Sequence, residues 1–217
     1  MTRRPLILSI LVLTLALFAA AAWFVSRPDA SIMTVTTEVA EVLVRPWSPV
    51  HGSADAPVTI VEFFDPACEA CRAFHPIVKD IMAEHGDAVR VVIRYTSFHG
   101  EVSDVAIRVL EAARLQGVYA PVMDALMLEQ PRWASHGGMR PDLIMSIAAS
   151  AGLDADAAEA QIRSPEVVAV LNNDRADVET VGVRQTPTFF VNGRPLETFG
   201  EAQLRALVAD EVQRAGL

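Results

Sequence analysis

Cysteine, aromatic residues and positive charge are all scarce in this chain of 217 residues. It has two cysteines, its aromatic content is 6%, and 18 Lys and Arg stand against 27 Asp and Glu, for a formal net charge of −9. Nucleic acids are bound largely through Lys and Arg on the phosphates and aromatic rings on the bases, so this composition argues against a nucleic-acid partner. Internal repeats and low-complexity tracts are also lacking, which leaves one sizeable domain, or one domain with an insertion, as the expectation.

A long apolar run lies near the N-terminus. Arg3 and Arg4 precede about 20 mostly apolar residues, 6–25, a length typical of an export signal or a membrane anchor. The run continues through residues 23–25, past the small residues 19–22 where a signal peptide could be cut, and this favours an anchor over a cleaved signal that leaves a soluble protein. The rest of the chain is then predicted to be periplasmic or otherwise extracytoplasmic, where a cysteine pair can stay oxidised.

The remaining pattern predicts strand, helix and strand, then a block of helices, then two strands and a helix. Residues 58–64 are almost all apolar, as in a central strand, and helical spacing follows from Cys68 to Gly86. Upstream, the β-branched residues within 34–44 favour a short strand. Ser164 followed by Pro165 predicts a helix start, and the pair Asn192-Gly193 predicts a hairpin turn between the last two strands. The predicted parts are a signal or anchor (1–26), a linker with an N-terminal strand (27–55), a first α/β part (56–100), a helical insertion (101–181) and a second α/β part (182–217).

The two cysteines, Cys68 and Cys71, stand in the stretch DPACEACRAFHP, where the strand pattern changes to a helical one. A c-type haem site is excluded because position 72 is arginine and not histidine. A structural zinc site lacks a second cysteine pair, but a metal site that uses His75 as a third ligand, including a copper site, remains open. Two unpaired core cysteines also remain open. His75 is otherwise interpreted as a surface residue, and His51 as a solvated loop residue.

A redox pair has a positive physical argument. The N-terminus of a helix offers unpaired backbone N–H groups and the positive end of the helix dipole, which stabilise a thiolate and lower its pKa. Cys68 would occupy that position, and Cys71 would lie three residues later on the same face, within reach of a disulfide. Cys68 is therefore predicted to be the exposed nucleophile and Cys71 the buried resolving thiol.

The stretches APVTIVEFFDPACEACRAFHP and GVRQTPTFFVNG together resemble the thioredoxin superfamily, and more narrowly the DsbA-like exported thiol:disulfide oxidoreductases. The resemblance implies an α/β thioredoxin fold with an inserted all-helical domain, and the 116 positions between Cys71 and Pro187 leave room for it. It implies that Glu62 relays a proton for the resolving thiol. It also implies that Pro76 kinks the first helix, and that Thr186 and Pro187 form a cis-proline loop that binds substrate.

Glu69 and Ala70, the dipeptide between the cysteines, depart from the pairs that strong oxidases of this family carry. A carboxylate at Glu69 opposes a thiolate at Cys68, so it is predicted to raise the pKa of that cysteine. A less stabilised thiolate means a more stable disulfide. The protein is therefore predicted to be a weaker oxidant than strong DsbA-type enzymes.

Together these features predict an oxidase-like thiol:disulfide oxidoreductase that exchanges the Cys68–Cys71 disulfide with cysteines of envelope or secreted proteins. The alternatives are a periplasmic reductase or isomerase, and a copper chaperone that uses the same cysteine pair. No cofactor beyond the redox-active disulfide and no metal are expected. The chain is expected to be a monomer, with a membrane-bound or soluble redox partner that resets the active site.

Overall fold

The computed structural model describes residues 37–135 and 138–217, so the predicted signal or anchor lies outside the described residues. No helix within these two ranges has the length and apolar character needed to cross a membrane.

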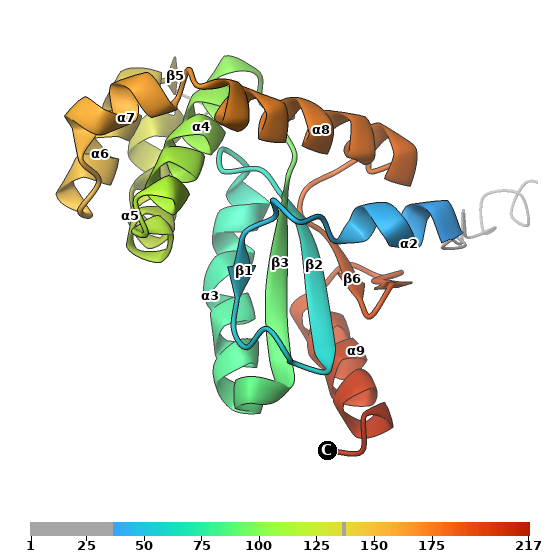
Figure 1. The fold of residues 1–217 in the computed structure, drawn as a ribbon. Coiled ribbons are helices and arrows are strands. Elements are labelled where there is room, and N and C mark those ends of the chain that lie inside the picture. Colours follow the sequence, from blue (N-terminus) through green and yellow to red (C-terminus); the bar gives the residue numbers. More distant parts are fainter. Residues whose placement is uncertain (1–36, 136–137) are drawn as a thin grey trace, which may run out of the picture. The chain divides into compact units, whose positions relative to one another are not determined.

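A mixed sheet of five strands forms the centre of the described region (Figure 1). Its strands follow the spatial order β1-β3-β2-β6-β7. They are β1 (Val50–His51), β2 (Val58–Phe64), β3 (Val89–Tyr95), β6 (Thr188–Val191) and β7 (Arg194–Pro195). β2 and β3 are parallel, whereas β1, β6 and β7 pair antiparallel with their neighbours. The apolar run in β2 is explained by its central place, because both faces of such a strand are covered.

Helices α3 (Glu69–His85) and α9 (Glu201–Arg214) pack on the sheet and against each other. The block between β3 and β6 contains five α-helices among its described residues. They are α4 (Glu101–Leu115), α5 (Tyr119–Trp133), α6 (Ile144–Ser150), α7 (Ala155–Gln161) and α8 (Pro165–Val181). Short 3₁₀ turns, η1 (Gly86–Ala88) and η2 (Pro141–Leu143), follow α3 and precede α6. The predicted α/β fold with a helical insertion is confirmed.

The prediction that the insertion is entirely helical is wrong. A two-stranded hairpin, β4 (Ala134–Ser135) and β5 (Gly138–Met139), lies between α5 and η2. Helix α8, at the end of the insertion, contacts both α4 and β3, and the predicted domain boundaries stay predictions.

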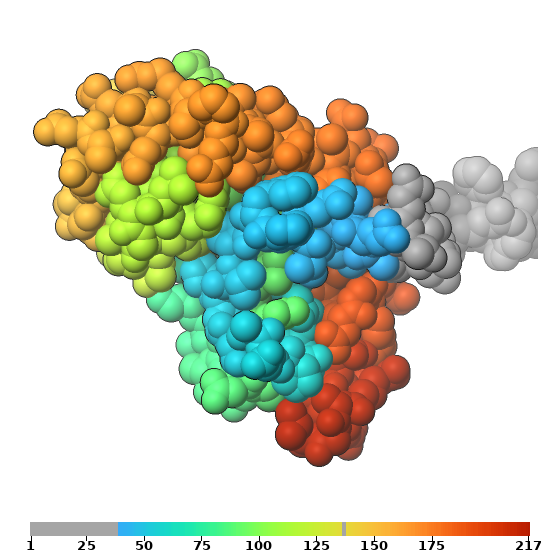
Figure 2. Space-filling view, in the orientation of Figure 1, coloured from blue at the N-terminus to red at the C-terminus, as the bar shows by residue number. Residues whose placement is uncertain are grey.

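The predicted strand within 34–44 is also wrong, because residues Thr37–Leu43 form helix α2. Val42 and Leu43 are buried, and α2 packs on α8, where Figure 2 shows its blue segment against the orange one. Burial against a neighbouring helix outweighs the weak β-preference of valine and threonine. The N-terminal strand is instead the two-residue β1.

Other local predictions are confirmed. The hydroxyl of Ser164 accepts a hydrogen bond from the backbone N–H of Val167, and Pro165 is the first residue of α8. Asn192 and Gly193 turn the β6–β7 hairpin with φ of 47° and 80°, the positive values that a tight hairpin requires. Pro76 lies inside α3; the kink that it was expected to cause stays a prediction.

A buried ion-pair network fixes α2 and α8 to the sheet. Arg94 on β3 is fully buried and lies 2.9 Å from Asp174 and 2.6 Å from Asp177, both on α8. Arg45, which follows α2, pairs with Asp177 at 2.7 Å, and the indole N–H of Trp47 donates to Asp174 at 2.9 Å. Because these carboxylates are nearly inaccessible, their charges depend on the two arginines.

Candidate active site

The cysteine pair lies where β2 gives way to α3. β2 ends at Phe64, and Cys68 is the N-cap residue of α3 with an extended backbone (φ −80°, ψ 124°). The first backbone N–H groups of a helix have no partner within the helix. Those of Ala70 and Cys71 lower the pKa of the Cys68 thiol, as the sequence predicted for a helix start, although the Cys68 side chain makes no capping hydrogen bond.

The two thiols are free in the structure and differ less in exposure than predicted. Cys71 is fully buried, as expected for the resolving thiol. Cys68 is not the openly exposed thiol that was predicted, because 8% of its surface is accessible. Its burial has a clear cause: its thiol lies against the loop before β6 and donates to the carbonyl oxygen of Thr186 at 3.2 Å.

The pKa values of the two thiols move in opposite directions. The pKa of Cys68 is lowered to about 5, and the largest cause is the hydrogen bond from the Cys71 thiol. Partial burial acts in the opposite direction, whereas the Thr186 side chain and the helix N–H groups lower the pKa further. Burial raises the pKa of Cys71, and the hydrogen bond to Cys68 and the charge of Glu62 act in the same direction. The pair therefore holds one thiolate and one thiol at neutral pH.

Glu69 was predicted to raise the pKa of Cys68. The net shift is downward, so any opposing effect of this carboxylate is outweighed by the hydrogen bonds to the sulfur. Glu69 and Ala70 form the first turn of α3, and the structure gives a clear role only to the backbone N–H of Ala70.

The Thr186–Pro187 peptide is cis, as predicted, and lies directly before β6. β6 pairs antiparallel with β2, with Phe189 opposite Glu62. This pairing brings Thr186 to Cys68 across 118 positions of sequence. The role of the loop in binding substrate stays a prediction.

Glu62 lies in the middle of β2 and is 3% exposed. Its Oε1 atom has no hydrogen-bond partner among the described residues. Burial raises the pKa of Glu62 to about 8, and the nearby charge of Cys68 adds to the effect. Its carboxyl group therefore carries a proton near neutral pH and lies close enough to the pair to be influenced by it, as a proton relay requires.

Asp65 is a site residue that sequence reasoning missed. It is fully buried between β2 and the cysteines, and its backbone N–H approaches the Cys71 sulfur at 3.5 Å. Its carboxylate accepts from the hydroxyl of Ser103 at 2.7 Å and lies 2.7 Å from Nδ1 of His99. Asp65 thus ties the loop before Cys68 to the start of α4. The sequence did offer a signal for this role, because Asp65 stands next to Pro66 between a buried strand and the start of a helix.

Gln130 on α5 was also missed. Its side chain is fully buried, and its amide nitrogen donates to the carbonyl oxygens of Pro66 at 2.7 Å and Cys68 at 2.9 Å. Its amide oxygen accepts from Arg72 at 3.2 Å. Gln130 therefore holds the backbone on both sides of Ala67. No local pattern predicts this contact, because Gln130 is 62 positions from Cys68.

His75 was an open candidate for a third metal ligand. Its Nε2 atom lies 2.7 Å from Asp124 Oδ1 on α5, and its side chain is 19% exposed, so it is not a simple surface residue. Among residues 37–135 and 138–217, no three His, Cys, Asp or Glu side chains are grouped so that they could hold a metal ion. The metal-site alternative therefore receives no support from the described geometry.

Comparisons with known proteins agree with this geometry. The thioredoxin family profile matches residues 45–210. A thioredoxin-like oxidoreductase from Silicibacter pomeroyi DSS-3 is 31% identical with a TM-score of 0.68, over 83% of this chain and 97% of that protein. The alpha-DsbA1 protein of Wolbachia pipientis is 17% identical with a TM-score of 0.71, over 82% and 98% of the two chains, and this likeness concerns the fold.

A different kind of relative matches only in part. The Na(+)/H(+) antiporter NhaA of Herminiimonas arsenicoxydans is 33% identical over 183 residues, which are 82% of this chain and 28% of the antiporter. The chain thus spans little more than a quarter of that relative's length. From the family match, the fold and the arrangement of the cysteine pair, we conclude that this chain belongs to the thioredoxin family and has the DsbA-like form of its fold.

Proposed function

We propose that this protein is an exported thiol:disulfide oxidoreductase that transfers the Cys68–Cys71 disulfide to cysteines of other envelope proteins. One observation carries the proposal: the pKa of Cys68 is lowered to about 5 beside a fully buried Cys71 whose pKa is raised. A thiolate of low pKa is a good leaving group from a mixed disulfide. The oxidoreductase relative at 31% identity supports the same reaction class.

The reaction balances with the groups present. A substrate thiolate attacks the Cys68 sulfur of the disulfide, so a mixed disulfide forms and Cys71 leaves as a thiolate. Cys71 then takes a proton, for which the protonated carboxyl group of Glu62 is the donor. The second substrate thiolate attacks the substrate sulfur of the mixed disulfide and releases Cys68 as a thiolate. The substrate pair loses two electrons, and the cysteine pair gains them.

The cis-proline loop would hold the substrate during this exchange. It precedes β6, and the carbonyl oxygen of Thr186 already contacts the Cys68 thiol. An extended peptide that crosses this loop could pair with its backbone and bring its own cysteine to Cys68.

The pKa also indicates the strength of the oxidant. A value of about 5 lies between the values of about 7 for thioredoxin and about 3.5 for DsbA. The reduction potential should accordingly lie between about −270 mV and about −120 mV. We therefore still expect a weaker oxidant than the strong DsbA-type enzymes. The reason is now the intermediate pKa of Cys68 and no longer the charge of Glu69.

The test is the redox equilibrium of the Cys68–Cys71 pair with glutathione, together with oxidation of a reduced, unfolded protein that contains cysteines. Cys68→Ser should abolish the transfer, whereas Cys71→Ser should trap the mixed disulfide. A potential at or below that of thioredoxin would refute the oxidase assignment and favour a reductase or isomerase.

We propose that the protein acts outside the cytoplasm, because the apolar segment 6–25 indicates export, either as a membrane anchor or as a cleaved signal. Partners would be cysteine-containing envelope or secreted proteins and a second protein that re-oxidises the pair, with the chain acting as a monomer. The redox state of the pair in cells tests this direction. A mostly oxidised pair is expected, and a mostly reduced pair would contradict it.

A further inference from the structure

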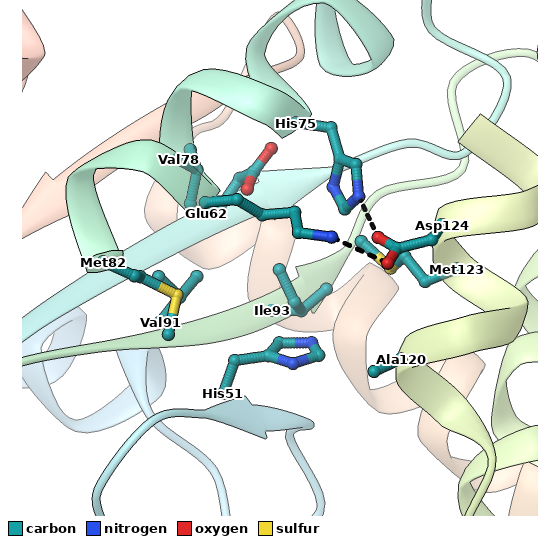
Figure 3. Close-up of a pocket in the computed structure, with 11 residues that line it drawn as sticks. His51, Glu62, His75, Val78, Met82, Val91, Ile93, Ala120, Met123 and Asp124 are labelled. Carbon is teal, nitrogen blue, oxygen red and sulfur yellow. Dashed lines mark hydrogen bonds and ion pairs between the residues drawn. The ribbon is translucent and has the colours of Figure 1, made fainter. Parts of the chain in front are cut away.

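Glu62 is one of the residues that line an inner cavity of about 230 Å³ (Figure 3). Four other polar residues line it and come from three elements: His51 on β1, His75 and Lys79 on α3, and Asp124 on α5. Most of the remaining wall is apolar, with side chains such as Val78, Met82, Val91, Ile93 and Met123. A cavity of this size with an unpartnered carboxyl oxygen can hold water.

A second hollow, the outer groove, lies between α3 and α5 and measures about 410 Å³. Three residues line both the inner cavity and the outer groove: His75, Lys79 and Asp124. The side chain of His75 is 19% exposed, against 53% for Lys79 and 47% for Asp124. His75 thus lies where the inner cavity and the outer groove meet, and it is the least exposed of the three residues that line both.

The contacts of His75 suit proton transfer. Its Nε2 atom is 2.7 Å from Asp124 Oδ1, and the other carboxylate oxygen accepts from Lys79 at 2.7 Å. A carboxylate partner favours the tautomer with hydrogen on Nε2. Nδ1 has no hydrogen-bond partner in the described part of the chain, so its lone pair can accept a proton.

We propose that the inner cavity is the route by which Glu62 exchanges its proton with solvent, and that His75, positioned by Asp124, transfers the proton at the mouth of this route. The inference rests on the proposed function. Once Glu62 has given its proton to Cys71, its carboxylate must be protonated again. The imidazolium form of His75 supplies that proton through cavity water and takes another from solvent in the outer groove, and no electrons move in this step.

Other titratable groups face the same space. His51 lies on the β1 side of the cavity and stacks near Tyr119, with ring centroids 5.3 Å apart. Burial lowers the pKa of His51, and the charge of His75 adds to the effect, so His51 is neutral at neutral pH. Arg72 and Asp80, both on α3, line the outer groove. His75 and Lys79 both pair with Asp124 and both line the outer groove, but an ammonium group offers only donors, whereas the imidazole of His75 can accept a proton as well as donate one.

The test compares His75→Gln with His85→Gln, a matched control on the same helix that lines neither hollow. The steady-state rate of disulfide exchange over many turnovers, with dithiothreitol as reductant and a disulfide-bonded protein as substrate, is measured from pH 5 to pH 9, because in each turnover Glu62 gives up its proton and must regain it. His75→Gln should slow this reaction about tenfold or more at neutral pH and change the shape of the pH profile, since a positioned acid or base contributes at least that much. Added imidazole should restore the rate, and His85→Gln should match the wild type.

The reaction of Cys68 with iodoacetamide separates this role from a structural one. It should keep the same pH dependence in His75→Gln, because the proposal leaves the nucleophile unchanged. Asp124→Asn is the second variant. It keeps the imidazole and should shift the pH profile with a smaller loss of rate than His75→Gln. It serves as the test if His75→Gln folds poorly. A His75→Gln rate within twofold of the wild type at every pH would overturn the proposal. The proposed function itself would be refuted if dithiothreitol reduced the wild-type Cys68–Cys71 disulfide no faster than it reduces the disulfide of oxidised glutathione.

Discussion

The acidity of Cys68 depends first on the thiol of Cys71, and this dependence can be tested with a pair of variants. The Cys71 hydrogen bond is the largest cause of the shift that brings the pKa of Cys68 to about 5. A hydrogen bond to a charged group contributes about 1.5–3 kcal/mol, and one pKa unit corresponds to about 1.4 kcal/mol. Cys71→Ala should therefore raise the pKa of Cys68 by about one to two units. Cys71→Ser keeps a donor at this position and should leave the pKa close to that of the wild type.

The assay is the rate of carbamidomethylation of Cys68 by iodoacetamide between pH 3 and pH 9, followed by mass spectrometry. Both variants retain Cys68 as their one cysteine, so the modified mass reports on a single thiol. Urea unfolding of each variant checks that the fold is retained. Equal pKa values for Cys71→Ala and Cys71→Ser would refute the reasoning, because the helix N–H groups and Thr186 would then account for the acidity without a donor at position 71.

Two further predictions concern stability. Burial, with a smaller effect of the Cys68 charge, raises the pKa of Glu62 from 4.5 to about 8, so the stabilisation by its carboxyl group is present below pH 4.5 and is lost as the pH rises through 8. In the reduced form with free thiols, the unfolding free energy should fall by about 1.4 kcal/mol per pH unit in that window relative to Glu62→Gln. Urea unfolding measures it, and the same pH dependence in both proteins would contradict this. Arg94→Met leaves Asp174 and Asp177 without their shared partner and should cost about 3–5 kcal/mol of unfolding free energy, whereas Arg140→Met at an exposed ion pair should cost less than about 1 kcal/mol. A similar cost for the two arginine variants would show that the buried network contributes little.

The sequence predicted what depends on local pattern or on neighbouring positions. The change from an apolar strand to helical spacing placed Cys68 at the start of a helix, because strand and helix differ in the period of their buried residues. Ser164 before Pro165 marked a helix start for the same local reason. The cis peptide before Pro187 followed from the likeness of its loop to a known family, and its contact with Cys68 could not have been worked out from spacing alone.

Contacts that depend on helix packing could not be predicted. His75 and Asp124 are 49 positions apart, and they meet because α5 lies against α3. Both residues are polar and stand on helices, so the sequence favoured a solvated surface for His75. His51 was likewise interpreted as a solvated loop residue, but it is half-buried and lines the inner cavity because β1 pairs with the edge of β3.

The side chain of Gln130 has a consequence for any attempt to shorten or exchange the helical insertion. It supplies the hydrogen-bond donors for the carbonyl oxygens of Pro66 and Cys68, while Ser103, near the start of the insertion, supplies one for the carboxylate of Asp65. Excision of residues 101–181 would remove the side-chain donor of both carbonyl oxygens and one donor of Asp65, which would keep its contact with His99. The insertion is therefore not a detachable module. A chimera that takes this segment from a relative should keep its thiol chemistry only if the graft retains a donor at both positions.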